Sequence, residues 1–196
     1  GHDAAHGALF DSKRLGSITG HLLFLPSLHA YAAWVLGHNR IHHGQTVRQT
    51  MDFVWHPITP EQYRTMNKLQ RARHRVEWSR FGAGLYYLRE VWFNKMITFL
   101  PPERYRKAIR RDTLIIAAFA VAVTEATIPT LGWLAWVKLW LVPWLGFNCW
   151  IGFTVYVHHI EPGIKWWTRR EWDSFRGQLE GTTILWAPAW LNFFIH

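Results

Sequence analysis

The sequence is poor in cysteine and lacks the common cofactor-binding fingerprints. Its 196 residues include a single cysteine, Cys149, so the chain can form neither an internal disulfide nor a thiolate cluster. A structural zinc finger and an iron–sulfur cluster are thereby excluded. Neither a G-x-G-x-x-G dinucleotide fingerprint nor a haem-binding segment is present. Any redox chemistry of this chain must therefore use other metal ligands and receive its electrons from outside.

Acidic residues are scarce in one long region. Residues 64–111 contain 13 of the 22 Lys and Arg residues but only three acids, while the whole chain carries a net charge of +9. Such a block can bind nucleic acid. Beside strongly apolar segments, however, it favours a cytoplasmic region that obeys the positive-inside rule and faces anionic headgroups. We therefore expect residues 64–111 to be a basic cytosolic region and expect no nucleic-acid partner.

Apolar and aromatic residues are abundant, with 14 Trp and 12 Phe, as is typical of membrane proteins with aromatic belts at their interfaces. The first of three apolar stretches covers residues 15–36 and is long enough to cross a bilayer. His21, Pro26 and His29 interrupt it, and polar groups at mid-depth are costly. We expect this stretch to be a re-entrant or interfacial segment.

The other two apolar stretches predict a transmembrane helical hairpin over residues 113–157. The first covers residues 113–128 and is expected to end at Pro129, and the second covers residues 131–157. At about 1.5 Å per residue the second is about 40 Å long, enough for a hydrocarbon core of about 30 Å. The first is only about 24 Å long and must recruit flanking residues.

The segments around the hairpin are more polar. Residues 81–102 mix bulky apolar residues with charged ones such as Arg89 and Lys95, and predict an amphipathic helix on the membrane surface, ended by the two prolines at 101–102. Residues 158–196 are expected to return along the cytosolic side. Together these features predict one all-α domain over residues 1–196, an integral membrane helical bundle.

Histidines recur in four short motifs. These are GHDAAH with His2 and His6, GHNRIHHG with His38, His42 and His43, VYVHHIEP with His158 and His159, and NFFIH with His196. Helical residues four apart share a face with Cβ atoms about 5–6 Å apart, so their imidazoles can bind one ion or one ion each of a close pair. An isolated histidine is more often a hydrogen-bonded core or surface residue, the interpretation given to His21, His29, His56 and His74.

The order of the motifs along the chain predicts where they meet. The second motif precedes the basic region, and the chain reaches His158 and His159 only after the predicted hairpin has crossed the membrane twice. An even number of crossings returns the chain to the side from which it started. The histidine motifs are therefore expected to converge on the basic, cytoplasmic face of an integral membrane protein, in a bacterial inner membrane or its equivalent.

The ligand type restricts the metal. More than five imidazoles exceed what one zinc ion needs, and imidazole suits Fe, Cu, Zn and Ni. We therefore expect two metal ions, with iron favoured because its open positions activate dioxygen. A histidine-rich metal transporter or sensor is an alternative from another class, but its histidines should lie at mid-depth within membrane helices rather than at the ends of apolar stretches.

The motifs resemble the histidine boxes of the membrane fatty acid desaturase family, H-x3-4-H, H-x2-3-H-H and a final H/Q-x2-3-H-H. GHDAAHG matches the first box and HNRIHHG the second, and the similarity continues through MDFVWHPITPEQY, the hairpin and LEGTT…LNFFIH. Most similar are the omega-6 (delta-12) acyl-lipid desaturases of bacteria and plastids. The resemblance implies a mushroom of four transmembrane helices under a cytosolic helical cap. The first two membrane helices are expected before residue 1, and the last box shortly after His196.

The resemblance also implies roles for individual residues. The implied iron ligands are His2, His6, His38, His42, His43 and His159. Three further residues are expected beside the ligands: Asp3, which could orient an imidazole through its free N–H, His158, where relatives often carry glutamine, and His196, just before the last box.

The implied reaction is the dioxygen-dependent removal of two hydrogens from an acyl chain, here expected on a membrane lipid, which forms a cis double bond at a centre of two irons. Electrons would come from ferredoxin or cytochrome b5, and a basic face suits an acidic donor. A related diiron hydroxylase or ketolase acting on carotenoids, sterols or alkanes shares the boxes and is the nearest alternative. Without the last box, the chain alone is expected to be inactive.

Overall fold

The computed structural model describes residues 1–183 and 188–189, and this part of the chain contains helices and no strand. In chain order the elements are α1 (His2–His6), α2 (Lys13–Phe24), α3 (Tyr31–Val35), η1 (Leu36–His42), α4 (Pro60–Thr65), α5 (Lys68–Glu77), α6 (Ala83–Tyr86), η2 (Tyr87–Ile97), α7 (Glu103–Leu131), α8 (Trp133–Trp136), η3 (Val137–Leu141), α9 (Val142–His159) and α10 (Ser174–Glu180). The η segments are wound as π-helix and continue the helices before them. The predicted all-α fold is confirmed.

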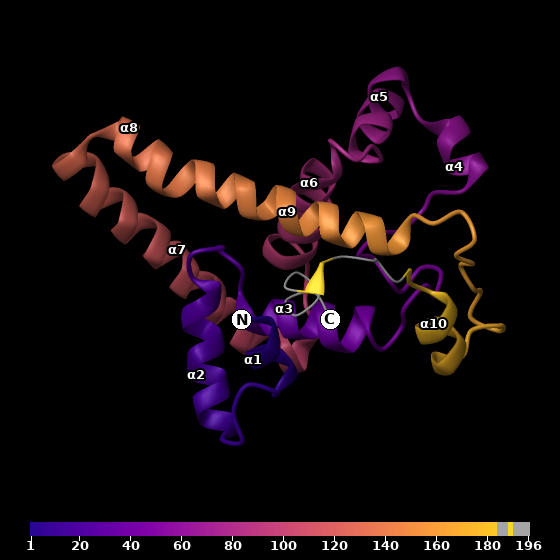
Figure 1. Ribbon diagram of the computed structural model, residues 1–196, viewed down its shortest axis with the longest axis horizontal. Helices are drawn as coiled ribbons and strands as arrows, with labels where there is room; N and C mark the ends of the chain where they lie inside the picture. The colour runs from indigo at the N-terminus through magenta and orange to yellow at the C-terminus, as the bar shows by residue number, and fades with distance from the viewer. Residues whose placement is uncertain (184–187, 190–196) are drawn as a thin grey trace.

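Helix α7 and the continuous helix α8–η3–α9 form a long hairpin whose turn lies far from both marked chain ends (Figure 1). Both helices are long and apolar enough to cross a membrane. The 29 residues of α7 extend about 43 Å because the helix recruits a basic segment before residue 113. The expected end at Pro129 is wrong. Pro129 removes only its own N–H bond to the carbonyl four residues earlier, and α7 continues to Leu131, after which Gly132, with a φ of 84°, ends it.

The hairpin exposes its apolar side chains rather than burying them. Leu114 and Val121 on α7 and Trp150 on α9 are each about three-fifths exposed. Between the two helices, indole N–H groups are satisfied internally, since Trp136 Nε1 donates to Thr124 Oγ1 at 3.1 Å. Inside the hydrocarbon layer of a membrane, polar groups must be hydrogen-bonded within the protein and the outer surface must be apolar, as observed for this hairpin.

The apolar stretch at residues 15–36 does not form one continuous helix. Helix α2 ends at Phe24, and α3 starts at Tyr31 after a turn in which Leu28 has a φ of 54°. The buried carboxylate of Asp112 on α7 holds this break in place, because it accepts from Ala32 N at 2.8 Å and lies 3.3 Å from His21 Nε2. The interruption is the one expected of a re-entrant segment, and its depth in a membrane stays a prediction.

The helix expected over residues 81–102 packs directly on α9. A Cβ added to Gly152 would lie 2.6 Å from the carbonyl oxygen of Ala83, so the two backbones approach as closely as glycine allows. The helix ends at Ile97, before the two prolines predicted to stop it, and it buries Tyr86 and Tyr87. Its contact with lipid stays a prediction.

Candidate metal centre

Two short helical segments bring four imidazoles together. In α1, His2 and His6 share a face, with ring centroids 4.5 Å apart. In η1 the π-winding pairs residues five apart, so His43 N donates to His38 O at 2.9 Å and the two rings are 4.5 Å apart. The sequence spacing predicts His38 and His42 on one face, but the wider helical turn selects His38 and His43 instead.

The resulting group, called here the four-histidine group, consists of His2, His6, His38 and His43. One ring nitrogen from each residue lies within 4.8 Å of those of the other three. His38 Nε2 is 3.2 Å from His2 Nε2 and 3.0 Å from His43 Nε2. Ring nitrogens this close must share protons or a common cation, and a metal ion satisfies all four lone pairs at once.

A second group lies beside the first. His42, turned away by the π-winding, meets His159 at the end of α9 with ring centroids 4.9 Å apart. Its ring is also 5.7 Å from that of His38 and 5.3 Å from that of His43, so the two groups adjoin. The prediction that the second motif and the 158–159 doublet converge is confirmed in the geometry. Both His42 and His159 are buried.

A carboxylate that the sequence reasoning missed orients His42. His42 Nδ1 donates to the Asp52 carboxylate at 2.9 Å, so that Nε2 is the ring nitrogen that His42 can offer to a metal. Asp52 also accepts from Val47 N and Val54 N. Burial alone would raise the pKa of Asp52, but the His42 contact and these two backbone donors hold it below its ordinary value. The signal was the acid in MDFVWHP, ten residues after His42.

The residues expected beside the ligands have different environments. Asp3 Oδ1 lies 3.2 Å from His2 Nδ1, close enough to orient that ring, although both side chains are mostly exposed. His158 Nδ1 lies 3.1 Å from the carbonyl oxygen of Thr183. His196 lies outside the described residues.

Hydrogen bonds account for three of the four histidines interpreted as isolated. His21 contacts Ser17 O, His29 contacts Ser27 O and Tyr87, and His56 accepts from Thr50 N. His74 instead packs between the rings of Tyr63 and Trp78. All four lie apart from the clustered imidazoles, as the sequence interpretation expects.

The electrostatics of the site favour neutral imidazoles. Burial is the largest cause that lowers the pKa of His38, and the neighbouring imidazoles lower it further. Burial and the nearby His42 ring lower the pKa of His43 to about 4, and burial also lowers the pKa of His6. Neutral rings have lone pairs available for a cation at pH 7.

One atom of the second group needs a partner. His159 Nδ1 is buried and has no hydrogen-bond partner within the described part of the chain. A buried polar atom without a partner is costly, and a metal ion beside it would remove that cost. The all-nitrogen donor set of both groups therefore fits metal, and imidazole is a good ligand for iron.

Comparison with known proteins decides the family. The family model for fatty acid desaturases matches residues 1–196. This chain belongs to the fatty acid desaturase family. It is 32% identical over 202 residues to the chloroplastic omega-6 fatty acid desaturase of Brassica napus, an alignment that covers 100% of this chain and 44% of the relative.

Two further relatives give the same picture. The chain is 31% identical to the chloroplastic omega-6 fatty acid desaturase of Arabidopsis thaliana, covering 100% of the chain and 43% of the relative. It is 29% identical to the sn-1 oleoyl-lipid 12-desaturase of Picosynechococcus sp., covering 100% and 56%. The predicted family is confirmed, and the relatives that the chain matches are omega-6 and oleoyl-lipid 12-desaturases, as the resemblance indicated. The chain spans about half the length of these relatives.

Proposed function

We propose that the intact protein is an oxidoreductase that forms a cis double bond in the acyl chain of a membrane lipid, at a centre of two irons. The contact between His42 and His159 carries this proposal, because it joins a histidine motif before the hairpin to one after it. One relative is named an omega-6 fatty acid desaturase and another an sn-1 oleoyl-lipid 12-desaturase. These names support an acyl-lipid substrate.

The residues that would hold the two ions fall into the two groups described above. The four-histidine group would hold one ion, and His42 with His159 would contribute to the site of the other. Iron bound there supplies the oxidising power that an unactivated acyl C–H bond requires when dioxygen reacts. Asp52 holds the proton at His42 Nδ1, so that His42 would offer Nε2 to a bound metal in one fixed tautomer.

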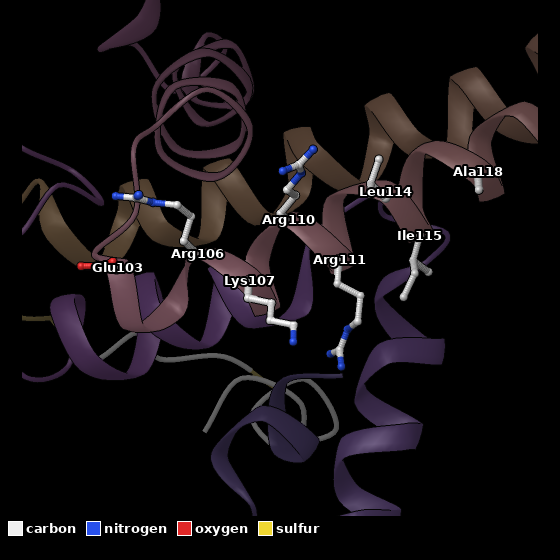
Figure 2. Close-up of a pocket in the computed structure, with 8 residues that line it drawn as sticks. All are labelled: Glu103, Arg106, Lys107, Arg110, Arg111, Leu114, Ile115 and Ala118. Atoms are coloured by element: carbon white, nitrogen blue, oxygen red, sulfur yellow. The ribbon is translucent and has the colours of Figure 1, made fainter.

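The charge pattern of α7 supports the membrane orientation. Figure 2 shows cationic side chains along the first turns of this helix, followed by apolar ones. The cationic and apolar side chains together line a shallow groove, whose residues are Glu103, Arg106, Lys107, Arg110, Arg111, Leu114, Ile115 and Ala118. A change from cationic to apolar over two turns is typical of a helix that enters a bilayer from its cytoplasmic face. The histidine motifs would then lie on that face.

The electron donor would be an acidic protein such as ferredoxin or cytochrome b5. Residues 64–111 supply an exposed cationic surface, including most of α5 and the first turns of α7. Charge complementarity of this kind accelerates encounter and orients the partner. The role of the donor is to deliver the electrons that dioxygen reduction needs.

The test is to replace His42 by alanine in the full-length protein and to analyse acyl products by mass. We expect loss of the double bond with unchanged membrane insertion. His74→Ala is the matched control, because His74 lies on α5 and its ring packs against Tyr63 and Trp78, away from the clustered imidazoles. Normal product from His42→Ala would overturn the proposal. A wild-type product that has gained one oxygen, instead of losing two hydrogens, would assign the protein to the hydroxylases.

A further inference from the structure

A buried tryptophan, Trp34, packs against the four-histidine group. Trp34 on α3 stacks on His38 with ring centroids 4.1 Å apart and an interplanar angle of 24°. Its ring also contacts His2 edge-on at 5.7 Å. Trp34 is 5% exposed, so its indole connects the histidines to the interior of the protein rather than to solvent.

Behind Trp34 lies a buried tyrosine–histidine pair. Tyr87 on η2 and His29 in the turn before α3 are 2% and 1% exposed, and Tyr87 Oη lies 3.0 Å from His29 Nε2. Burial raises the pKa of Tyr87 well above its ordinary value, while hydrogen bonding from the Trp34 side chain acts in the opposite direction. Trp34, Tyr87 and His29 therefore form one continuous chain that starts at His38.

The direction of the hydrogen bond between Tyr87 and His29 is fixed by the other side of the imidazole. His29 Nδ1 lies 2.7 Å from the carbonyl oxygen of Ser27, which can only accept, so Nδ1 carries the proton. Burial lowers the pKa of His29 to about 4, so the ring is neutral at pH 7. His29 Nε2 must then accept, and the Tyr87 hydroxyl donates to it.

We infer that Trp34, Tyr87 and His29 form an oxidation relay that removes an oxidising equivalent from the metal centre when no acyl chain is bound. The inference rests on the proposed function, since the oxidant is the one that iron and dioxygen generate among the histidines. A phenol is readily oxidised only when its proton has a base to move to. His29 is a base already hydrogen-bonded to Tyr87, and it lies away from the metal ligands.

The relay balances in electrons and protons. Iron and dioxygen held at the four-histidine group would supply a one-electron oxidant, and Trp34 would lose an electron to it and become an indole radical cation. Tyr87 returns one electron to Trp34 while its phenolic proton moves to His29 Nε2. The products are neutral Trp34, a neutral Tyr87 radical and a protonated His29. One electron from the external donor restores the phenolate oxygen, and the proton returns from His29.

The neighbouring tyrosine provides a matched control. Tyr86 is also buried, at 4% exposure, and its pKa is also raised, mainly by burial. Its hydroxyl donates to the carbonyl oxygen of Phe53 and accepts from His56 N. A carbonyl oxygen cannot take a proton, so Tyr86 lacks the base that makes Tyr87 oxidisable.

The experiment uses the full-length, iron-loaded protein, reduced and mixed with dioxygen without acyl lipid, then frozen within milliseconds. Electron paramagnetic resonance should show a tyrosyl radical whose hyperfine pattern changes when ring-deuterated tyrosine is incorporated. Tyr87→Phe should abolish this signal and Tyr86→Phe should keep it. His29→Gln preserves a hydrogen-bond acceptor but not a base, and should lower the signal at least tenfold.

A second readout is chemical damage to the ligands. Without the relay the oxidant reacts locally, so peptides containing His38 or His2 should gain one oxygen several times more often in Tyr87→Phe than in Tyr86→Phe. Oxygen uptake recorded in the same wild-type sample separates the two proposals. Uptake without a tyrosyl signal, or a signal that persists in Tyr87→Phe, would overturn the relay alone, whereas a protein that takes up no oxygen even after acyl lipid is added would overturn both.

Discussion

The two histidine groups of the metal centre are built in opposite ways. The four-histidine group lies near the surface, and Asp3, which contacts His2, has a side chain that is 71% exposed. The second group is interior: the side chain of His42 is 9% exposed and that of Asp52 only 1%. The two carboxylate–imidazole distances are nearly equal, 3.2 Å and 2.9 Å. The comparison shows that burial and backbone donors, rather than distance, determine which carboxylate controls its histidine.

The largest expected effect is that of removing the buried carboxylate. Asp52→Ala removes the acceptor for His42 Nδ1 and for the buried N–H groups of Val47 and Val54. Unsatisfied buried donors cost about 1–3 kcal/mol each, and loss of such a carboxylate lowers metal affinity about 10–100-fold. We expect both a lower midpoint of thermal unfolding and a lower iron content in the full-length protein. Asp52→Asn, which keeps an acceptor, should be milder on stability, and equal losses in the two variants would contradict this account.

An intermediate effect is expected from acidification of the metal-free protein. His29 has a pKa of about 4 when folded, and the ordinary value of 6.5 applies to the unfolded chain. Between these values the unfolded state binds more protons, so stability is present above pH 6.5 and decreases as the pH falls toward 4. The slope is at most about 1.4 kcal/mol per pH unit for one histidine.

Denaturant unfolding at several pH values measures this slope. His29→Gln cannot titrate and should flatten the dependence between pH 6.5 and 4, because one of the histidines with a depressed pKa is gone. An unchanged slope in His29→Gln would show that His29 does not contribute to the acid sensitivity.

The smallest effect is expected for the exposed carboxylate. Asp3→Ala removes a contact of 3.2 Å between two largely solvated groups, and such pairs contribute about 0–1 kcal/mol. Thermal stability should stay within about 0.5 kcal/mol of wild type, with at most a small loss of iron. If Asp3→Ala were as damaging as Asp52→Ala, burial would not be what distinguishes the two groups.

Sequence reasoning predicted the parts of the site that depend on topology and missed those that depend on packing. An even number of crossings returns His159 to the side of His42 whatever the details of the hairpin, so their convergence was predictable. The pairing within the second motif was not, because spacing rules assume 3.6 residues per turn and η1 is π-wound, which moves His43 to the place expected for His42. Asp52 was missed because only folding brings a carboxylate ten residues along the chain within hydrogen-bond distance of His42 Nδ1.

The helix boundaries carry the same lesson. The apolar pattern located both arms of the hairpin, but it placed the end of α7 at Pro129 and the end of the 81–102 helix at its prolines. Both predictions used proline, which lacks a backbone N–H, as the signal for the end of a helix. The first helix actually ends at Leu131, before Gly132 with its positive φ, and the second ends at Ile97, where Thr98 N donates to Phe93 O.

The most direct test of the central claim is the position of iron in the full-length protein, measured by anomalous diffraction at the iron edge. Two peaks are expected, one at ligand distance from the ring nitrogens of the four-histidine group and one beside His42 Nε2 and His159. A single peak, or a peak in contact with only one of His42 and His159, would contradict the account that the hairpin joins these motifs into one dinuclear centre.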